Sequence, residues 1–379
     1  MNRRVLLAWL MLTTLIPAVS FAADGPSLRL LAERRGLAIG ANLPGLIFGK
    51  APNNWEQSPT IRIEQSIAAE HFSIMTAGWE MYPGQSWLAP GRYEFRGSDV
   101  FIRWCQDHNL SVHGHGLGYG CRVDWLKKFP VRTPEEKAAV RELYEAYIRD
   151  TVRHFAGRVH VWDVCNEQLL PAYTFSGYQT AQPYWKAYQD DPRDPESGVE
   201  WYRRTFHLAH EADPKAKLIL LDFNNEIVCP KSDRMFRLVR ELQADGVPVH
   251  GVGFQMHLTT ELNRSKGHGL ETDGDYYRSL TENFRRFSGL GVELWITELD
   301  VSIDTKKELE AELDRQASIY GEVVSIAVAT PNFRGIKFWG IIDRSPWGEV
   351  IATRPFLFDE TGRPKAAFYA VRNALAIPE

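Results

Sequence analysis

The stretch that decides the fold is Val159–Glu167, which reads Val-His-Val-Trp-Asp-Val-Cys-Asn-Glu. Such a mainly apolar run is typical of a strand that is buried on both faces of a parallel sheet. The run ends on an amide and a carboxylate, Asn166 and Glu167, where the strand would leave the sheet. A second run, Val292–Asp300 (Val-Glu-Leu-Trp-Ile-Thr-Glu-Leu-Asp), has the same design and carries Glu298 near its end. Two strands are therefore predicted to present a glutamate at the carboxyl edge of one sheet.

Short apolar segments alternate with longer amphipathic segments outward from these two runs. Strands are predicted at Gly36–Leu43, His71–Thr76, Leu110–His115, Val159–Cys165, Lys217–Asp222, Gly251–His257, Val292–Thr297 and Gly335–Trp339. Helices are predicted at Glu64–Glu70, Asp99–His108, Thr133–Phe155, Gly198–Glu211, Ser232–Asp245, Asp275–Phe287, Lys306–Ala329 and Lys365–Ala376. Strict alternation of eight such units indicates a parallel sheet and, in this length, a closed (β/α)8 TIM barrel of one domain. An open doubly wound sheet is the alternative, but no glycine-rich phosphate-binding fingerprint follows the first strand.

The composition is that of an ordinary soluble globular protein. Of the 379 residues, 44% are hydrophobic and 24% are charged, as is usual for globular domains. The formal net charge of -4 gives no reason to expect a nucleic acid or an anionic membrane as a partner. Aromatic residues make up 12% and include 12 Trp. Such side chains suit the faces of sugar rings, but they also fill large cores.

The N-terminus has the pattern of an export signal. A basic Asn2-Arg3-Arg4 precedes a mostly apolar segment from Val5 to Val19, and small residues follow in Ser20-Phe21-Ala22. We therefore expect a signal peptide over residues 1–22, a barrel domain over residues 23–379, and a periplasmic or secreted mature protein. No later stretch is long and apolar enough to span a membrane. We expect a monomer with no membrane association after cleavage.

The four cysteines are Cys105, Cys121, Cys165 and Cys229. None has CxxC spacing, so a structural zinc site is not expected. Export permits disulfides, and a bridge between Cys105 and Cys121 is one option. Cys165 lies inside a predicted strand and reads as a small buried hydrophobe.

Active sites of TIM barrels form at the carboxyl ends of the strands, which turns the predicted strands into a set of candidate residues. The set comprises Glu80, His113, His115, Asn166, Glu167, Asp222, Asn224, Gln255, His257, Glu298, Asp300, Trp339 and Trp347. Carboxylates, amides, imidazoles and indoles together suit a polar, ring-shaped ligand, although Trp339 could equally be barrel core. Two carboxylates facing one cleft are the minimal equipment for hydrolysing a glycosidic bond.

Each of these residue types also has a plainer reading. A single glutamate at a strand end is commonly solvated or ion-paired, and a single histidine is commonly structural. His115 and His257 could also hold a metal together with Asp222 or Asp300. Apart from His113 and His115, however, no pair of histidines has HxH or HxxxH spacing. We therefore expect neither a metal nor another cofactor.

Six motifs occur in an order that is familiar from one family. They are His113-Gly-His115-Gly-Leu117, Trp162-Asp-Val-Cys-Asn166-Glu167, Leu221-Asp222-Phe223-Asn224, Gly251-Val-Gly-Phe-Gln255-Met-His257-Leu258, Ile296-Thr-Glu298-Leu-Asp300, and Phe338-Trp339-Gly340 with Asp343 and Trp347. The chain thereby resembles glycoside hydrolase family 10, the family of retaining endo-β-1,4-xylanases, over most of its length.

The resemblance implies roles for the candidate residues. Glu167 would be the general acid/base and Glu298 the nucleophile, with the carboxylates roughly 5–5.5 Å apart and the anomeric configuration retained. Asn166 would hydrogen-bond the 2-hydroxyl of the sugar, and Asp300 would orient His257. The residues implied to surround the nucleophile or the sugar are His115, Asn224, Gln255, His257, Trp339 and Trp347.

Two strand ends depart from the family pattern. Family members carry Pro-Glu-Asn-x-Met-Lys-Trp where this chain has Ala77–Pro83 (Ala-Gly-Trp-Glu-Met-Tyr-Pro), and Trp-His-x-Gln where it has Tyr119–Arg122 (Tyr-Gly-Cys-Arg). The resemblance implies that the Glu-Asn-Lys set binds the sugar one place beyond the cleavage point on the non-reducing side. Losing such buried hydrogen-bonding groups should cost roughly 1–3 kcal/mol each. The residues expected in the rebuilt subsite are Trp79, Glu80, Tyr82 and Arg122.

The sequence leaves three functions open. The first is a retaining endo-β-glycosidase with xylan as the default polysaccharide substrate. The second is a diverged hydrolase of another β-glycan, decorated or acidic, such as a bacterial exopolysaccharide. The third is a carbohydrate-binding protein without catalysis, against which the retention of Glu167 and Glu298 argues. Loss of the Glu-Asn-Lys set favours the second function over a plain xylanase.

Overall fold

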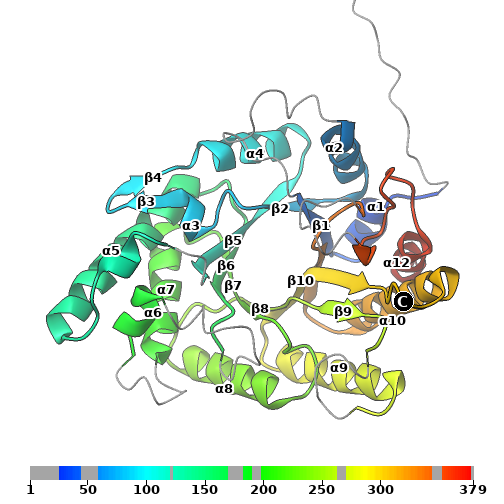
Figure 1. The fold of residues 1–379 in the computed structure, drawn as a ribbon. Coiled ribbons are helices and arrows are strands. Elements are labelled where there is room, and N and C mark those ends of the chain that lie inside the picture. Colours follow the sequence, from blue (N-terminus) through cyan, green and yellow to red (C-terminus); the bar gives the residue numbers. More distant parts are fainter. Residues whose placement is uncertain are drawn as a thin grey trace, which may run out of the picture.

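Eight parallel strands form a closed ring with helices on its outside (Figure 1). The computed structural model describes residues 25–43, 59–119, 123–169, 182–189, 198–262, 270–343 and 352–376. The ring consists of β1 (Ala38–Leu43), β2 (Ile74–Ala77), β5 (Ser111–Tyr119), β6 (Val161–Asn166), β7 (Lys217–Asp222), β8 (Gly251–Phe254), β10 (Glu293–Ser302) and β11 (Phe333–Phe338). Because β11 pairs with both β10 and β1, the sheet has no open edge. The predicted (β/α)8 barrel is confirmed.

The helices fill the intervals between the strands. They are α1 (Leu28–Arg34), α2 (Pro59–His71), α4 (Arg96–Asp107), α5 (Pro134–Phe155), α7 (Val199–Ala212), α8 (Pro230–Ala244), α9 (Asp273–Ser288), α10 (Leu309–Ala329) and α12 (Ala366–Ala376). Shorter elements lie in the connections: α3 (Pro83–Ser86), the hairpin of β3 (Trp87–Ala89) and β4 (Arg92–Tyr93), a 3-10 turn at Leu126–Lys128, α6 (Pro183–Ala187) and β9 (His257–Thr259). None of the helices among the described residues combines the length and the apolar character needed to cross a membrane.

Local sequence explains where the best-defined helix begins. Thr133 caps α5: its hydroxyl accepts from the backbone N–H of Glu136 at 3.2 Å, and the Glu136 carboxylate accepts from the N–H of Thr133. Such a reciprocal box satisfies two backbone donors that the helix leaves free. By contrast, α4 begins at Arg96 after Phe95, which makes no side-chain cap. The helix predicted from Asp99, with Ser98 or Asp99 as its cap, therefore begins three residues earlier than expected, and that cap was wrong.

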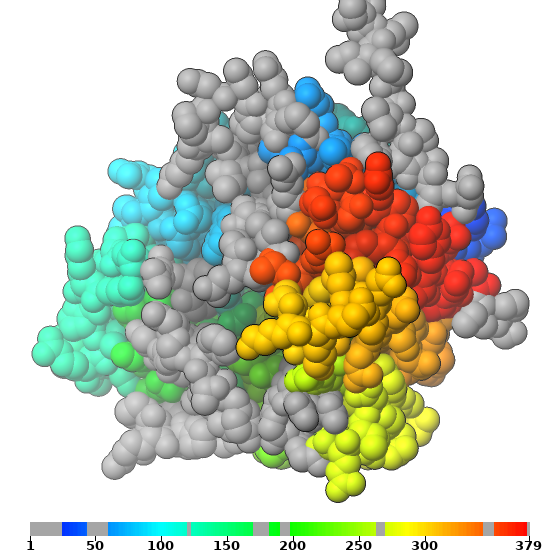
Figure 2. Space-filling view, turned by 45° about the vertical axis from the view of Figure 1, so that its right-hand side comes forward, coloured from blue at the N-terminus to red at the C-terminus, as the bar shows by residue number. Residues whose placement is uncertain are grey.

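The two ends of the described fold lie together. The C-terminal segment (red) lies against the N-terminal elements (blue) in Figure 2, and α1 packs on α12. The Arg35 side chain donates from Nε to the carbonyl of Leu375 at 2.7 Å. This contact joins the segment after α1 to the last helix, α12.

The barrel interior is layered. Strand residues two apart face the same side, so Ile74 and Val161 belong to an apolar layer that includes Trp295. The next inward positions on β2 and β6 carry Thr76 and Asp163, both buried. A polar layer thus lies directly on this apolar layer, on the side of the carboxyl ends of the strands.

Three sequence predictions need correction. His71 ends helix α2 and does not begin a strand. The predicted strand Gly251–His257 is divided, because Met256 has a φ of 65° and His257 begins β9. Cys105, like Cys165 and Cys229, is a buried free thiol, so the suggested bridge to Cys121 was wrong. Cys121 itself and the predicted signal peptide lie outside the described residues.

Candidate active site

Glu298 lies near the carboxyl end of β10 with its side chain almost fully buried. Its Oε2 is 3.1 Å from Nε2 of His257. Its Oε1 has no hydrogen-bond partner among the described residues and lies 3.9 Å from Nε2 of His115. One oxygen of the carboxylate is thus anchored while the other is free to react.

His257 is held in place by Asp300. Strand β9 pairs with β10 so that the two residues are register partners, and Nδ1 of His257 is 2.8 Å from Oδ2 of Asp300. Burial lowers the pKa of His257, but the carboxylates of Asp300 and Glu298 outweigh burial and hold this pKa well above its ordinary value. The imidazolium therefore bridges two carboxylates, and the contact expected between Asp300 and His257 is present.

Glu167 follows β6 in a left-handed backbone conformation with a φ of 59°. One amide nitrogen, Nε2 of Gln255, donates to Oε1 of Glu167 at 2.9 Å and to Oδ1 of Asn166 at 3.1 Å. The Nδ2 group of Asn166 is buried and has no partner among the described residues. Asn166 therefore has a donor left for a ligand, and Glu167 is held by a neutral amide.

The loop after Glu167 is fixed by a buried ion pair. Oδ2 of Asp222 accepts from the backbone N–H of Leu169 at 3.0 Å, and Oδ1 accepts from Nζ of Lys231 at 2.5 Å. Both charged side chains are about 1% exposed. Asp222 thus acts on the site through the backbone two residues after Glu167.

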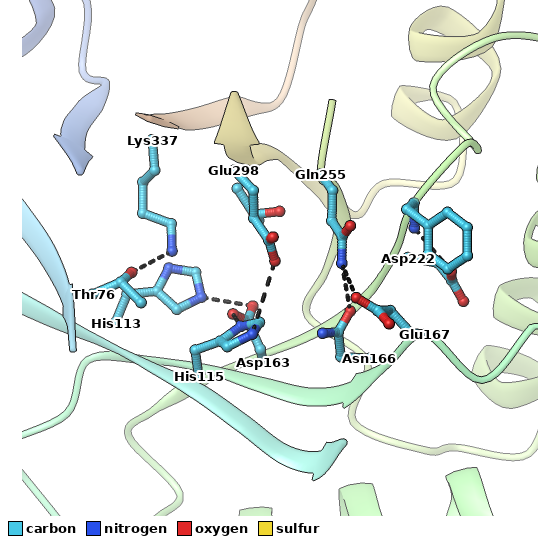
Figure 3. Close-up of polar contacts among 12 residues, drawn as sticks. Thr76, His113, His115, Asp163, Asn166, Glu167, Asp222, Gln255, Glu298 and Lys337 are labelled. Carbon is cyan, nitrogen blue, oxygen red and sulfur yellow. Dashed lines mark hydrogen bonds and ion pairs between the residues drawn. The ribbon is translucent and has the colours of Figure 1, made fainter. Parts of the chain in front are cut away.

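A second polar network continues from Glu298 into the barrel. Figure 3 shows Glu298 between two groups, with Gln255, Asn166 and Glu167 on one side and His113, Thr76 and Lys337 on the other. Both carboxylate oxygens of Asp163 contact a histidine. Oδ1 lies 2.7 Å from Nε2 of His113, and Oδ2 lies 2.7 Å from Nδ1 of His115.

The two histidines differ in charge. Burial lowers the pKa of His113 to about 4 despite the nearby Asp163, so His113 is neutral at pH 7. For His115, burial also lowers the pKa, but the hydrogen bond to Asp163 and the Glu298 carboxylate outweigh it, and the pKa is raised. His115 is thus the imidazole of the pair that favours a positive charge.

The sequence of this chain matches one known protein family. The family model described as Glycosyl hydrolase family 10 matches residues 38–374. The chain belongs to glycosyl hydrolase family 10. This family 10 hydrolase is 29% identical over 365 residues to endo-1,4-beta-xylanase B of Thermotoga neapolitana, with 94% of this chain and 93% of the relative covered.

Solved structures give the same result. The native xylanase 10B of Thermotoga maritima is 30% identical, with a TM-score of 0.76 over 92% of this chain and 98% of that one. The xylanase 10B of Thermotoga petrophila RKU-1 in complex with xylobiose is 29% identical, with a TM-score of 0.77 over 93% and 98%.

Aromatic side chains gather at the end of β2, where the sequence of this family 10 hydrolase departs from the family pattern. Trp79 is 37% exposed, and its ring centroid is 5.1 Å from that of Tyr82. Tyr82 in turn lies 5.3 Å from Tyr119 and 5.2 Å from His115. Trp339 is 5.4 Å from His115 on the other side. The rings form a continuous run from Trp79 to the histidine beside the nucleophile candidate.

The remaining candidates are placed less centrally. Both carboxyl oxygens of Glu80 are buried and have no hydrogen-bond partner among the described residues, and burial raises the pKa of Glu80 to about 7. Asn224 follows β7, half-buried, with a φ of 54°. Arg122 and Trp347 lie outside the described residues. In the described part of the chain, no three His, Cys, Asp or Glu side chains converge as metal ligands would.

Sequence reasoning gave no role to two residues of the inner network, Asp163 and Lys337. Each is a buried charged residue inside a mainly apolar strand, Val161–Asn166 or Phe333–Phe338. A buried charge almost always has a partner, so this pattern was the available signal.

Proposed function

We propose that this family 10 glycoside hydrolase is a retaining endo-β-1,4-xylanase, with Glu298 as nucleophile and Glu167 as general acid/base. One observation carries the assignment: Glu167 directly follows β6, Glu298 lies in the second half of β10, and both accept from Gln255 or His257 in the same site. Glu298 is anchored through Oε2, and its Oε1 has no hydrogen-bond partner in the described part of the chain. Glu167 accepts a hydrogen bond from the neutral amide of Gln255. The relatives that are named xylanases support xylan as the substrate.

The first step forms a covalent intermediate. Oε1 of Glu298 attacks the anomeric carbon, and the bond to the leaving oxygen breaks while protonated Glu167 gives that oxygen its proton. His257 keeps hold of Oε2, so the attacking oxygen is aimed by the other half of the carboxylate. The free Nδ2 donor of Asn166 is available to the sugar 2-hydroxyl, an interaction that strengthens in such transition states.

The second step releases the sugar. Glu167, now a carboxylate, takes a proton from water, the water oxygen attacks the anomeric carbon, and Glu298 leaves as a carboxylate. Two displacements at one carbon restore its configuration. His257 and His115, whose pKa values are raised, lie beside Glu298 and favour its departure as an anion.

Replacement of Glu298 tests the proposal. Glu298→Ala is expected to abolish turnover of xylan while the circular dichroism spectrum stays that of the wild type. Added azide should restore cleavage of an activated aryl β-xylobioside and give the glycosyl azide of inverted configuration. Glu293→Ala, at the other end of the same strand, is the matched control and should keep its activity. Normal turnover by Glu298→Ala would refute the nucleophile assignment.

A second candidate, hydrolysis of a different or decorated β-glycan, is favoured by the aromatic run. Glu167 protonates the leaving group, so the retained sugars extend from Glu298 away from Glu167, toward the side where Thr76 of β2 lies (Figure 3). On that side lies the exposed Trp79, whose ring packs on the buried Tyr82, and Tyr82 in turn packs on the half-buried Tyr119. Sizing the products from xylan, arabinoxylan, mixed-linkage glucan and bacterial exopolysaccharides decides between the candidates. Xylo-oligosaccharides from plain xylan would support the first, and their absence beside turnover of another glycan the second.

We further propose that the protein is exported through the general secretion route and acts as a monomer. The basic, apolar and small-residue sequence of residues 1–22 supports export. N-terminal sequencing of the mature protein should begin near residue 23, and light scattering should give the mass of one chain. An uncleaved cytoplasmic product would contradict export.

A further inference from the structure

Asn42 is a buried amide without a hydrogen bond. It lies near the end of β1 and is 1% exposed, and neither its Oδ1 nor its Nδ2 has a partner among the described residues. Buried polar side chains are nearly always hydrogen-bonded, because a group that leaves water without gaining a partner is destabilising. Asn283 shows the usual state: it is equally buried, and its Nδ2 donates to the carbonyls of Asn225 and Glu226 at 2.8 and 2.9 Å. Both polar atoms of Asn42 are therefore left for a ligand.

The side chain of Asn42 faces the barrel interior. Strand residues two apart share a face, and Ala38, four residues earlier in β1, packs on the apolar layer inside the barrel. Asn42 is also the register partner of Thr76 in β2, whose hydroxyl accepts from Nζ of Lys337 at 2.7 Å. Lys337 is itself the register partner of Gly40. Asn42 thus lies two residues nearer the carboxyl ends of the strands than the backbone of this buried lysine does.

On its other side, Asn42 is next to the position of Trp339. Ala41 is the register partner of Phe338 in β11, and Asn42 and Trp339 are the residues that follow this pair. Neighbouring strands lie about 4.8 Å apart. Asn42 therefore stands between Thr76 and Trp339, at the edge of the sheet where the site lies.

Trp339 connects this position to the proposed nucleophile. Its ring centroid is 5.4 Å from that of His115 and 6.1 Å from that of His257, the two histidines beside Glu298. Glu298 is itself only 3% exposed, so burial does not separate Asn42 from the residues that meet the sugar in the proposed reaction.

We infer that Asn42 is a substrate-binding residue, whose amide hydrogen-bonds a hydroxyl of the retained sugars. The inference rests on the proposed function, which places those sugars on the side of Glu298 where Thr76 of β2 lies (Figure 3). An amide has an acceptor oxygen and a donor nitrogen, and a sugar hydroxyl both donates and accepts. One hydroxyl, or two adjacent ones, thus satisfies both atoms of Asn42, whereas a carboxylate would satisfy the donor alone. A neutral sugar fits this place better than a uronic acid.

Replacement of the amide by a side chain of similar shape tests the inference. Asn42→Leu should lower kcat/KM on an activated aryl β-xylobioside by about 10- to 100-fold, as expected for two lost hydrogen bonds. Its thermal unfolding midpoint should equal or exceed that of the wild type, because no hydrogen bond within the described protein is lost. An unchanged kcat/KM would overturn the inference, since an amide that serves only the fold, or only binds water, has no effect on the substrate.

Asn283→Leu is the matched control. It removes an amide that is buried to the same extent and is hydrogen-bonded within the protein, so its unfolding midpoint should fall while its kcat/KM stays at the wild-type value. If Asn42→Leu does not fold, Asn42→Ala decides by the same kinetic measurement. A loss of kcat/KM on both an aryl β-xyloside and the xylobioside would support a contact with the first retained sugar, and a loss on the xylobioside alone a contact with the second.

The contacted hydroxyl can be found with aryl β-xylobiosides in which one hydroxyl of the retained sugars at a time is replaced by hydrogen. A site built to hydrogen-bond a hydroxyl discriminates against the analogue that lacks it. One analogue should therefore lose kcat/KM with the wild type and lose no more with Asn42→Leu, as in a double-mutant cycle. Equal losses in both proteins for every analogue would refute the contact.

The inference and the proposed function fail separately. A wild-type protein that cleaves the aryl β-xylobioside as well as Asn42→Leu does keeps its function and loses the inference. A wild-type protein that cleaves no aryl β-xyloside or β-xylobioside loses the proposed function, and the inference with it.

Discussion

Glu298 and Glu167 are held by different groups. Nε2 of His257 and Nε2 of His115 lie 3.1 Å and 3.9 Å from the Glu298 carboxylate. Glu167 accepts a hydrogen bond from the neutral amide of Gln255. A nucleophile has to remain a carboxylate, whereas an acid/base has to hold a proton in one step and lose it in the next. Cations around one glutamate and an amide beside the other match these two requirements.

Removing the acid should have the largest effect. Glu167→Ala is expected to lower kcat on xylan by about 10²–10⁴-fold, the usual contribution of general acid–base catalysis. The same variant should lose little of the glycosylation rate on a 2,4-dinitrophenyl glycoside, because this leaving group needs no proton. Burst-phase kinetics on both substrates measure the two steps. Equal losses on the two substrates would show that Glu167 does more than transfer protons.

Breaking the buried ion pair that supports the loop after Glu167 should have the next largest effect. Lys231→Met leaves the buried carboxylate of Asp222 without its cation, and removing one partner of a buried pair typically costs about 3–5 kcal/mol. Urea unfolding should show this loss. Lys337→Met removes a lysine that has no direct ion pair among the described residues, so its loss should be smaller. Similar losses of unfolding free energy for both variants would contradict the distinction between Lys231, which has a direct ion pair, and Lys337.

The protonation of Glu80 is expected to make the stability of the protein depend on pH. Burial raises the pKa of Glu80 from its ordinary 4.5 to about 7, so the folded state binds the proton more tightly than the unfolded state. The stability that this proton contributes is complete below pH 4.5 and is lost as pH rises through 7. Glu80→Gln should therefore be more stable than the wild type at pH 8, by up to ~2 kcal/mol. Thermal unfolding at pH 5 and pH 8 measures the difference, and identical pH dependence in both proteins would contradict it.

The smallest effect is expected at the exposed end of the aromatic run. Trp79→Ala should raise KM for long oligosaccharides by about 2- to 10-fold, which corresponds to the ~0.5–1.5 kcal/mol of an aromatic contact. Its kcat should not change, because the ring lies beyond the residues that touch Glu298. Leu88→Ala, another exposed apolar residue, is the control. A change in kcat alone would place Trp79 in the reaction centre instead.

The sequence predicted those parts of the fold that depend on local pattern. The strand Lys217–Asp222 was predicted at its observed bounds because an apolar run with polar ends is typical of a buried barrel strand. The division between β8 and β9 was missed because it depends on the left-handed backbone at Met256, a residue that no turn rule marks. The start of α4 was missed because Phe95 is not a capping residue type.

The site was predictable where it repeats a motif and not where distant strands meet. Asn166, Glu167 and Glu298 follow directly from two strand ends. The pairing of Lys337 with Thr76 joins residues 261 positions apart, and no local pattern relates them. Likewise, the two histidines that share Asp163 lie about 50 positions away in the chain. These contacts depend on the closure of the barrel.

The backbone at Glu167 has a consequence for evolution and for engineering. A φ of 59° is a conformation that residues other than glycine adopt at a cost of roughly 1–2 kcal/mol, and the surrounding barrel has to supply it. Glycine at this position would relieve that cost and would remove the carboxyl group. Selection for stability alone would thus favour an inactive protein here, so any programme that raises the melting temperature of this barrel must exclude position 167 from its search.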